Sequence, residues 1–295
     1  MTLVATLISN PQTRALTPSA ANMASQALGA SGVNWLAEEI ACDIPLPDGL
    51  EAEAADQRLR EVLDGRPIDI AVHSAEGRRK KMLIADMDST MIDQECIDEL
   101  ADEIGIKEHV AAITARAMNG EVDFEPALRE RVALLEDLET AVIERVIENR
   151  ISLAAGGRTL LATMNADGAY TALVSGGFDL FTGRIAANLG FHEHRANRLM
   201  ERAGRLTGKV AEPILGRQAK ADALTEIAER LRLEHSEIIA VGDGANDLSM
   251  LHLAGMGVAL HAKPSVAAEA SIRIDHGDLT ALLYLQGYAK AEFAE

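Results

Sequence analysis

Five polar residues follow one short apolar run, and their types suit acid–base or metal chemistry. In the stretch KKMLIADMDSTMIDQE the apolar run ends at Asp86, and Asp88, Ser89, Thr90 and Glu95 come next. A single Asp at this place is commonly a turn residue, because its side chain hydrogen-bonds the backbone of the turn. The pair Asp86 and Asp88 is not isolated, since further polar residues end other apolar runs. We therefore favour a catalytic or metal-binding role over a turn role.

A second acidic motif, VGDGAND, ends another apolar run. Gly242 and Gly244 permit a tight turn, and Asp243 and Asp247 add two carboxylates. An ordinary Gly-Asp turn is the alternative, with Asp247 stabilising the start of the next helix through its dipole. Crowded carboxylates without a cation would repel one another. Mg²⁺ binds one or two carboxylates and completes its shell with water and phosphate oxygens, so the two motifs together predict a magnesium site.

One residue outside these motifs could bind a phosphate group, and another could supply positive charge beside the acids. Ser175 ends the apolar run in LVSGGF, and its hydroxyl could act together with the backbone N–H of Gly176, because glycine lets a backbone approach an anion. A routine turn serine is the alternative. Lys220 lies near the start of the helical pattern GRQAKADALTEIAERLRL, where a lysine is by default solvated. It gains interest as the single cation that could sit beside the acidic residues.

Short apolar runs and helical patterns alternate from Lys81 onward, and they position these polar residues. The apolar runs occur at about 81–88, 169–177, 236–244 and 255–260. Strands that alternate with helices indicate a parallel sheet with crossover connections. Ligands bind beyond the carboxyl ends of such strands, which is where the polar residues occur. We expect an α/β fold with a Rossmann-like parallel sheet and one hairpin inserted at about 194–210.

A helical insertion interrupts this alternation directly after the first strand. Residues from about 93 to 155 are nearly all helical in pattern. Within 124–138 the apolar residues recur at helical spacing, at Phe124, Leu128, Val132, Leu135 and Leu138. An insertion at the carboxyl edge of a sheet is placed to cover a ligand, so we expect this segment to form a cap over the site.

Residues 1–76 differ in pattern from the rest of the chain. TLVATLIS, NWLAEEIACDIPL (34–46) and IDIAVHS are strand candidates, and helical patterns separate them. We expect a small α+β domain with the order strand, helix, strand, helix, strand. The basic segment Gly77–Lys81 is short and is expected to be a solvated linker rather than a polyanion site. The second domain would then span residues 81–295.

The composition argues against several classes of function. The chain of 295 residues carries a net charge of −18 and has no Lys/Arg stripe, which argues against nucleic acid as a partner. No apolar run approaches the ~20 residues that a membrane span needs. The chain has two cysteines without disulfide or zinc spacing, which fits a reducing compartment. The N-terminus lacks a signal-peptide pattern, so we expect a cytoplasmic protein without a membrane partner.

Taken together, the motifs resemble those of the haloacid-dehalogenase-like phosphohydrolases. Asp86 and Asp88 match the family's Asp-x-Asp motif, Ser175 its Ser/Thr, Lys220 its Lys, and GDGAND its paired acids. Order and spacing agree across residues 81–275. Longer stretches, DMDSTMIDQECIDELA and VSGGFDLF among them, resemble the phosphoserine phosphatases within this superfamily. In the order of its elements, the N-terminal unit resembles the ACT-like (ferredoxin-like) domain that some bacterial members carry.

The resemblance implies a mechanism that uses two aspartates. Asp86 would be the nucleophile and form an aspartyl-phosphate. Asp88 would first protonate the leaving serine oxygen and then act as the base for water. The resemblance also implies a Mg²⁺ ion held by Asp86, Asp243 and the backbone carbonyl of Asp88, with Asp247 supporting the shell through water. The residues that would contact the phosphoryl oxygens are Ser175, Gly176, Lys220 and Asn246.

Substrate choice would depend on residues that meet the rest of the ligand. Phosphoserine carries an ammonium and a carboxylate besides its phosphate. Glu95 lies in the first turn of a helical pattern, where the helix dipole favours a carboxylate even without a ligand. Arg131 lies beside the apolar stripe and could extend its head group into solvent. The resemblance favours substrate recognition by both, with Arg131 suited to a bidentate carboxylate contact and Phe124 packed near the substrate.

The function that the resemblance implies is Mg²⁺-dependent hydrolysis of O-phospho-L-serine to L-serine and phosphate, the last step of L-serine biosynthesis. A phosphatase or phosphotransferase for another small phosphomonoester would share the core motifs and differ only in the cap residues. A phospho-accepting signalling module also combines acids, a Ser/Thr and a Lys around Mg²⁺, but a long-lived phosphoryl group needs neither a cap nor Asp88. The N-terminal unit could bind an amino acid or form a homodimer, and both roles stay open.

Overall fold

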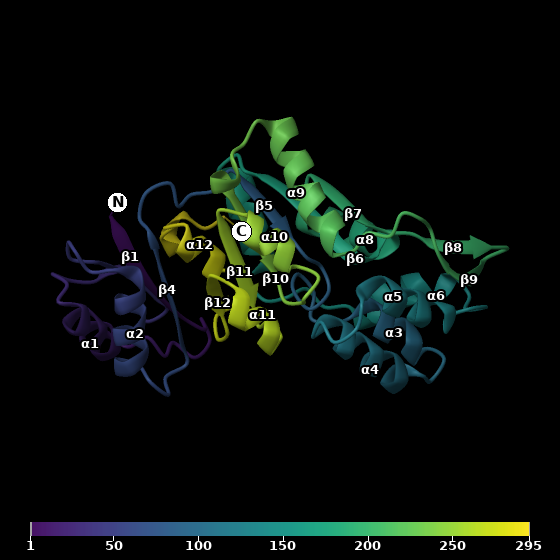
Figure 1. Cartoon of the computed structure of the whole chain (residues 1–295), viewed down its shortest axis with the longest axis horizontal. Helices are drawn as coiled ribbons and strands as arrows, with labels where there is room; N and C mark the ends of the chain where they lie inside the picture. Colours follow the sequence, from purple (N-terminus) through teal and green to yellow (C-terminus); the bar gives the residue numbers. More distant parts are fainter. Residues whose placement is uncertain (1, 295) are drawn as a thin grey trace.

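Two β-sheets lie side by side in the computed structural model, which describes residues 2–294 (Figure 1). The N-terminal part of the chain forms an antiparallel sheet of four strands at one end, and the rest forms a parallel sheet of six strands in the middle. A group of helices projects at the opposite end, beside a two-stranded sheet (Figure 1). This is the α/β fold with a small additional α+β unit that the sequence led us to expect.

The N-terminal sheet has the strand order β2-β3-β1-β4, and neighbouring strands are antiparallel. Its elements are β1 (Leu3–Ser9), α1 (Pro18–Leu28), β2 (Asn34–Ala37), β3 (Ala41–Pro45), α2 (Ala52–Val62) and β4 (Ile68–Ser74). This is the β-α-β-β-α-β order of the ferredoxin-like motif. Thr17 caps the N-terminus of α1 with its hydroxyl, which accepts a hydrogen bond from the N–H of Ala20, and Gly29 caps the C-terminus in the left-handed conformation.

The stretch 34–46, expected to be one strand, is a hairpin made of β2 and β3. The chain reverses over residues 38–40, where Glu38 is exposed and Glu39 has a φ of 59°. The expectation of a single strand was wrong because this turn contains neither Gly nor Pro, the residues that most often mark a turn in a sequence. The extra strand completes the sheet and makes β2 one of its edges.

All six strands of the central sheet are parallel, in the order β12-β11-β10-β5-β6-β7. They are β5 (Met82–Ala85), β6 (Tyr170–Phe178), β7 (Glu193–Asn197), β10 (Ile238–Gly242), β11 (Met256–Leu260) and β12 (Ile272–Ile274). Every residue of β5, β10 and β11 is buried, as expected for strands covered on both faces. Two of these strands were not expected from the sequence: β12 has only three residues, and most of β7 falls within the stretch expected to form the inserted hairpin.

Alternate residues of β5 face two separate layers of helices. Leu83 and Ala85 pack in one apolar cluster with residues of α7 (Gly157–Ala166), α8 (Asp179–Leu189) and α12 (Ala281–Leu285). Met82 and Ile84 pack in another with residues of α9 (Arg217–Leu231), α10 (Leu248–Leu253) and α11 (Pro264–Glu269). Two short 3₁₀ helices, His235–Glu237 and Lys290–Glu292, complete this part. The sheet is thus the middle layer of three, and its carboxyl edge is left for the site.

Four helices of the insertion form the cap, as the sequence predicted. They are α3 (Cys96–Asp102), α4 (Lys107–Met118), α5 (Phe124–Ala133) and α6 (Ala141–Arg150). Within the apolar stripe, Leu128, Val132, Leu135 and Leu138 are buried and Phe124 is half-buried. Helix α5 ends at Ala133, so the last two leucines lie in the turn that follows it. The stripe therefore serves first as the core of the cap.

The inserted hairpin is shorter than expected, and backbone hydrogen bonds connect it to the cap. It consists of β8 (Leu199–Arg202) and β9 (Arg205–Val210), because residues 193–197 join the central sheet as β7. The backbone N–H of Asp137 donates to the carbonyl of Leu206 at 3.0 Å, and the N–H of Leu206 donates to the carbonyl of Leu138 at 2.9 Å. The turn after α5 is thereby fixed to β9. No helix within residues 2–294 is long and apolar enough to cross a membrane.

The second face of the N-terminal sheet packs against the central part of the molecule. Ile8, Ala41 and Ala71 belong to the same buried cluster as Leu283. Polar contacts join the two parts as well. The Asp69 carboxylate on β4 accepts hydrogen bonds from the backbone N–H groups of three successive residues, 275 to 277, after β12. Both apolar and polar contacts therefore hold the two sheets together.

Candidate active site

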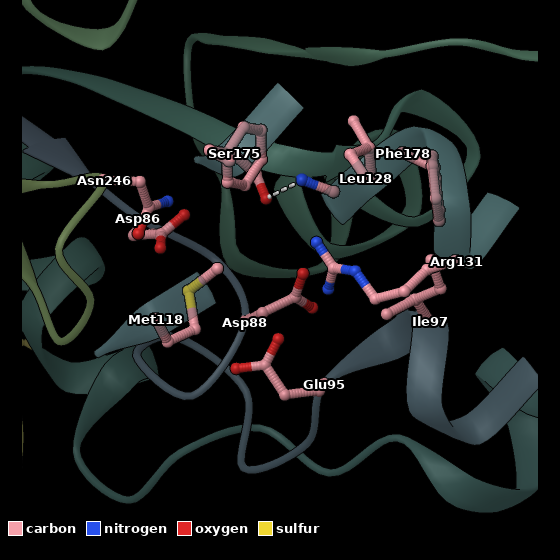
Figure 2. A pocket seen from close by; sticks show the side chains of 13 residues that line it. Asp86, Asp88, Glu95, Ile97, Met118, Leu128, Arg131, Ser175, Phe178 and Asn246 are labelled. Carbon is pink, nitrogen blue, oxygen red and sulfur yellow. Dashed lines mark hydrogen bonds between the residues drawn. The ribbon is translucent and has the colours of Figure 1, made fainter. Parts of the chain in front are cut away.

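The carboxyl edge of the central sheet carries the acidic motifs. Asp86 directly follows β5, Asp243 directly follows β10, and Ser175 lies inside β6. The three strands are neighbours in the sheet, so residues 68 or more positions apart in the sequence meet at one edge. Figure 2 shows Asp86, Ser175 and Asn246 near one another on one side of a pocket that the cap closes from the other.

A buried lysine joins two of the aspartates. The Nζ atom of Lys220 lies 2.7 Å from Oδ1 of Asp86 and 2.6 Å from Oδ1 of Asp247. The side chains of Lys220 and Asp247 are fully inaccessible to solvent. Burial alone would lower the pKa of Lys220, but the charges of Asp247 and Asp86 outweigh it and raise this pKa above its usual value. Lys220 is therefore a fixed positive charge under the site, not a solvated surface lysine.

Three carboxylates gather closely enough to bind a metal ion. Asp86, Asp243 and Asp247 can each offer an oxygen within 4.8 Å of the others. Burial raises the pKa of Asp243 to about 8 and raises the pKa of Asp86, chiefly because ionised groups lose their hydration there. Oδ2 of Asp243 is buried and has no hydrogen-bond partner within residues 2–294. Such an orphaned carboxylate oxygen fits a divalent cation, so the donor set suits a metal ion.

The three acids are not equally available to a metal. Oδ1 of Asp247 accepts the Lys220 ammonium, and Oδ2 accepts the N–H of Gly244 at 3.0 Å. In Asp243, Oδ1 accepts the Thr90 hydroxyl at 3.3 Å, and only the more distant Nζ of Lys263 approaches Oδ2, at 3.6 Å. Lys263 is a second cation beside the acids, so the expectation that Lys220 is the single one was wrong. Lys263 comes shortly after β11, just as Asp86 and Asp243 come after their strands. This position after an apolar run could have indicated from the sequence that Lys263 lies at the site.

Asp88 and Glu95 form a second acidic pair, nearer the cap. Oδ1 of Asp88 accepts the backbone N–H of Cys96 at 3.2 Å, and Oε1 of Glu95 accepts the Ser89 hydroxyl at 2.8 Å. Burial raises the pKa of Asp88 to about 7 and that of Glu95 to about 8, and the Asp88 charge adds to the second shift. A carboxyl group with a pKa near 7 can give and take a proton at neutral pH.

Small residues line the wall that β6 contributes. The Ser175 hydroxyl is buried and accepts the N–H of Gly177 at 2.9 Å. A Cβ atom added at Gly176 would lie 2.6 Å from the Phe124 ring, and one added at Gly177 would lie 2.7 Å from Oδ2 of Asp88. A side chain at either position would therefore displace the Phe124 ring or the Asp88 carboxylate. Gly176 was expected in the site from the sequence, whereas its neighbour Gly177 was not.

The cap supplies the opposite wall of the pocket. Phe124, Leu128 and Arg131 of α5 line it, opposite the residues of the central sheet. The Arg131 side chain is only 3% exposed, and Figure 2 shows its guanidinium turned toward Asp88. The cap also contacts the loop that follows β10 and carries Asp243, because the N–H of Ala245 in that loop donates to the carbonyl of Met118 at 2.9 Å. The pocket is thus closed between cap and sheet.

The structure brings the expected residues together in two layers. Those that line the pocket are Asp86, Asp88, Glu95, Phe124, Arg131, Ser175, Gly176 and Asn246. The remaining three, Lys220, Asp243 and Asp247, are buried beneath the pocket and connect to it through the Lys220–Asp86 contact and the acidic cluster. Oδ1 of Asn246, like Oδ2 of Asp243, is buried without a partner among the described residues. These two oxygens are therefore available to a ligand or a metal ion.

Comparison with known proteins identifies the family. The model of the haloacid dehalogenase-like hydrolases matches residues 83–252. The phosphoserine phosphatase of Lactococcus lactis is 44% identical over 204 residues, which cover 69% of this chain and 94% of that protein. A solved structure of a substrate-bound phosphoserine phosphatase has a TM-score of 0.67 and 40% identity, and covers 70% of this chain and 98% of its own.

One solved structure also shares the N-terminal part. A hydrolase of the same superfamily from Salmonella enterica serovar Typhi has a TM-score of 0.84 and 31% identity. That match covers 97% of this chain and 98% of the Salmonella protein, so it includes the N-terminal sheet as well as the sheet and cap. On the identity and coverage of these matches, the chain belongs to the phosphoserine phosphatases of the haloacid dehalogenase-like hydrolase family.

Proposed function

We propose that this chain hydrolyses O-phospho-L-serine to L-serine and inorganic phosphate with the help of Mg²⁺. The observation that carries the proposal is the pocket itself, which places the anionic Glu95 and the cationic Arg131 within one small space beside Asp86 and Asp88. Phosphoserine has an ammonium for the first, a carboxylate for the second and a phosphate for the aspartates. The names of the related enzymes support the same substrate.

Asp86 is the nucleophile in this proposal. Its Oδ1 accepts hydrogen bonds from the Met87 N–H at 2.8 Å and from Lys220, which fix the carboxylate and favour its ionised form. The other oxygen, Oδ2, attacks phosphorus, the bond from phosphorus to the serine oxygen breaks, and an aspartyl-phosphate results. Water then attacks this phosphorus and releases phosphate, which restores the Asp86 carboxylate.

Asp88 is the general acid in the first half of the proposed reaction and the general base in the second. Its raised pKa, about 7, lets the carboxyl group carry a proton when the substrate binds. That proton passes to the serine oxygen as it leaves. The resulting carboxylate then accepts a proton from the attacking water, which returns Asp88 to its first state. Gly177 lets Asp88 approach the phosphoryl site, since any side chain there would meet Oδ2.

Asp86, Asp243 and the backbone carbonyl of Asp88 are the groups that we propose to hold Mg²⁺. Asp247 supports them from below, because both of its oxygens are already engaged by Lys220 and Gly244. When bound, the ion supplies positive charge that offsets the approach of two anions. The phosphoryl oxygens are bound by the Ser175 hydroxyl, the Gly176 N–H, the Asn246 side chain and Lys220, which the proposal takes over from the family resemblance.

Substrate selection falls to the cap side of the pocket. Glu95 receives the ammonium of the substrate and Arg131 receives its carboxylate. Phe124 packs over Gly176, where a Cβ atom would already be too close, and so narrows the space around the serine carbon atoms. The assay is phosphate release from O-phospho-L-serine, O-phosphoethanolamine and an aryl phosphate, each with Mg²⁺ and with EDTA. We expect phosphoserine to be preferred and EDTA to abolish turnover; equal rates on all three substrates would contradict the proposal.

We also propose that residues 1–76 are an ACT-like domain and residues 81–295 the phosphatase domain, with the cap at about 93–155. Strand β4 ends at Ser74 and β5 begins at Met82, which supports a linker between the two proposed domains. All proposed catalytic groups lie beyond that linker. A homodimer formed through the N-terminal domain stays a prediction, and light scattering of the full chain at several concentrations tests it. The cytoplasmic location also stays a prediction from the sequence.

A further inference from the structure

Arg131 is a buried cation that has been kept out of an ion pair. Its side chain is 3% exposed, and burial lowers its pKa, while the charges of Glu95, Asp98 and Asp88 oppose that shift. Even so, no carboxylate oxygen within residues 2–294 lies inside the 4.0 Å of a salt bridge to it. A buried guanidinium usually pairs directly with an acid, because desolvated charges are costly when unpaired. Something in the cap must therefore hold Arg131 away from the acids around it.

The group that separates Arg131 from Asp98 is the hydroxyl of Thr114. Its Oγ1 donates to Oδ1 of Asp98 at 2.7 Å and accepts from Nη1 of Arg131 at 3.0 Å. The carbonyl of Val110 is a weaker second acceptor at 3.1 Å. A hydroxyl has a single proton, so donation to Asp98 leaves the oxygen lone pairs facing the guanidinium. Asp98 lies on α3, Thr114 on α4 and Arg131 on α5, so three cap helices contribute to this chain of contacts.

The hydrogen bonds of Arg131 determine which nitrogens of its guanidinium can still bind a carboxylate in the pocket. Nε donates to the carbonyl of Ala127 at 3.1 Å, and Nη1 donates to Thr114. Nη2 makes no hydrogen bond to any of the residues that the structure describes. With Nε in use, a carboxylate in the pocket meets the end of the guanidinium formed by its two terminal nitrogens. If Thr114 lacked its hydroxyl, the Asp98 carboxylate could take that place and turn the guanidinium away from the pocket.

We propose that Thr114, with Asp98 behind it, is a positioning residue for the substrate carboxylate. Its hydroxyl holds Arg131 toward the pocket and prevents an ion pair between Arg131 and Asp98. The inference rests on the proposed function, because it requires a substrate that carries a carboxylate. It goes beyond that function in assigning selectivity to a side chain that does not line the pocket.

The test compares two substrates that differ only in the carboxylate, O-phospho-L-serine and O-phosphoethanolamine. Thr114→Val keeps the shape of the side chain and removes the hydrogen bonds of the hydroxyl, including those with Asp98 and Arg131. We expect kcat/KM for phosphoserine to fall about tenfold more than kcat/KM for phosphoethanolamine, mainly through KM, since a hydrogen bond to a charged group is worth about that factor or more. Thr114→Ser restores the hydroxyl and should keep the wild-type ratio.

A double variant tests whether the Thr114 hydroxyl keeps Arg131 apart from Asp98 or only fills space in the cap. In Thr114→Val/Asp98→Asn the competing carboxylate is neutral, so we expect part of the lost preference for phosphoserine to return. Thr163→Val is the matched control: Thr163 is buried on α7, and its hydroxyl accepts the backbone N–H of Ala294 at 2.9 Å, outside the pocket. That variant should keep the wild-type ratio. Thermal unfolding verifies that each variant is folded, and Thr114→Ala replaces Thr114→Val if the latter is not.

Two results would overturn the inference: equal losses on both substrates in the folded Thr114 variant, or no recovery in the double variant. A wild-type enzyme that does not prefer phosphoserine over phosphoethanolamine would instead contradict the proposed function. A wild-type preference that survives in Thr114→Val contradicts only the role of Thr114. The two failures are therefore told apart by the wild-type ratio alone.

Discussion

The ammonium group of Lys220 lies 2.7 Å from the carboxylate of Asp86, and neither side chain is more than 7% exposed. The lysine comes from α9 and the aspartate from the loop after β5, 134 positions earlier in the chain. Removing one partner of a buried ion pair leaves the other charge without compensation. The nucleophile proposed for the reaction thus depends on a residue that lies beneath the pocket and not in its lining.

Lys220→Met should disable the enzyme and destabilise it. Methionine fills similar space but leaves Asp86 and Asp247 facing each other without the cation. We expect at least a thousandfold loss of turnover, roughly the effect of losing a group that acts with the nucleophile, and a loss of about 3–5 kcal/mol in the free energy of unfolding. Lys81→Met, at a lysine 67% exposed in its pair with Glu237, is the control. Similar effects of both substitutions would contradict the assignment.

Asp86→Asn should abolish turnover while the fold stays intact. The amide has nearly the same shape but is a poor nucleophile and a weaker metal ligand. Loss of a covalent nucleophile is expected to reduce kcat by several powers of ten. Asp93→Asn, at an exposed acid in the same loop, should retain activity. Steady-state phosphate release measures both variants, and a rate for Asp86→Asn within about tenfold of wild type would exclude Asp86 as the nucleophile.

Arg131→Ala and Glu95→Gln should each impair hydrolysis of phosphoserine much more than that of an aryl phosphate. The aryl ester has neither carboxylate nor ammonium, so it cannot use either contact. Charge-assisted hydrogen bonds are worth about 1.5–3 kcal/mol, which corresponds to a loss of roughly 10- to 150-fold in kcat/KM. Arg131→Lys should not rescue fully, because an ammonium lacks the planar fork.

A neighbouring arginine provides the control for Arg131. Arg129 lies on the same helix but is about half exposed and pairs with Glu212 at the surface. Arg129→Ala should therefore leave the ratio of the two rates unchanged. If Arg131→Ala slowed both substrates equally, the residue would serve the structure of the cap or the chemical step, and the case for phosphoserine over another phosphomonoester would fail.

Stability of the metal-free protein should fall as the pH rises from 5 to 8. The buried acids have pKa values raised to about 7 in Asp88 and about 8 in Glu95 and Asp243. Between these values and the ordinary pKa near 4, the folded state holds protons that the unfolded state has released. A folded state with more bound protons loses stability as the pH increases through that window.

The measurement is thermal unfolding in EDTA across this pH range. We expect Tm to decrease by roughly 5–10 °C, and Mg²⁺ to raise Tm more at pH 8 than at pH 5, since the ion compensates the ionised carboxylates. Asp243→Asn removes one of the titrating groups and should flatten the pH dependence. A Tm in EDTA that is constant or rises from pH 5 to 8 would contradict the clustering of these acids.

The central part of the site could be predicted from the sequence because the signals are local. Asp86 and Asp243 each end an apolar run, and the rule that parallel strands present their carboxyl ends to one edge brings them together. Lys220 was different. Its helical pattern gave no reason to bury it, and only the family resemblance assigned it a role. The burial and its two acid partners depend on how α9 packs on the sheet.

Contacts within the cap and within the N-terminal unit could not be predicted from the sequence either, because they too depend on packing. Thr114 and Asp98 are ordinary residues of two helices, and nothing in their spacing indicates that they meet Arg131 on a third. The turn at Glu39 likewise lacks the Gly or Pro that would have revealed two strands instead of one. In each case the decisive interaction joins segments whose relative placement is set by packing, for which the local pattern carries no signal.

The hydrogen bond from the N–H of Ala245 to the carbonyl of Met118 ties the cap to the loop that carries Asp243 and Asn246. Any movement that separated the cap from the sheet would break this bond and remove one support of that loop. The position of the cap and the conformation of the loop that carries Asp243 and Asn246 are therefore coupled through a single backbone contact.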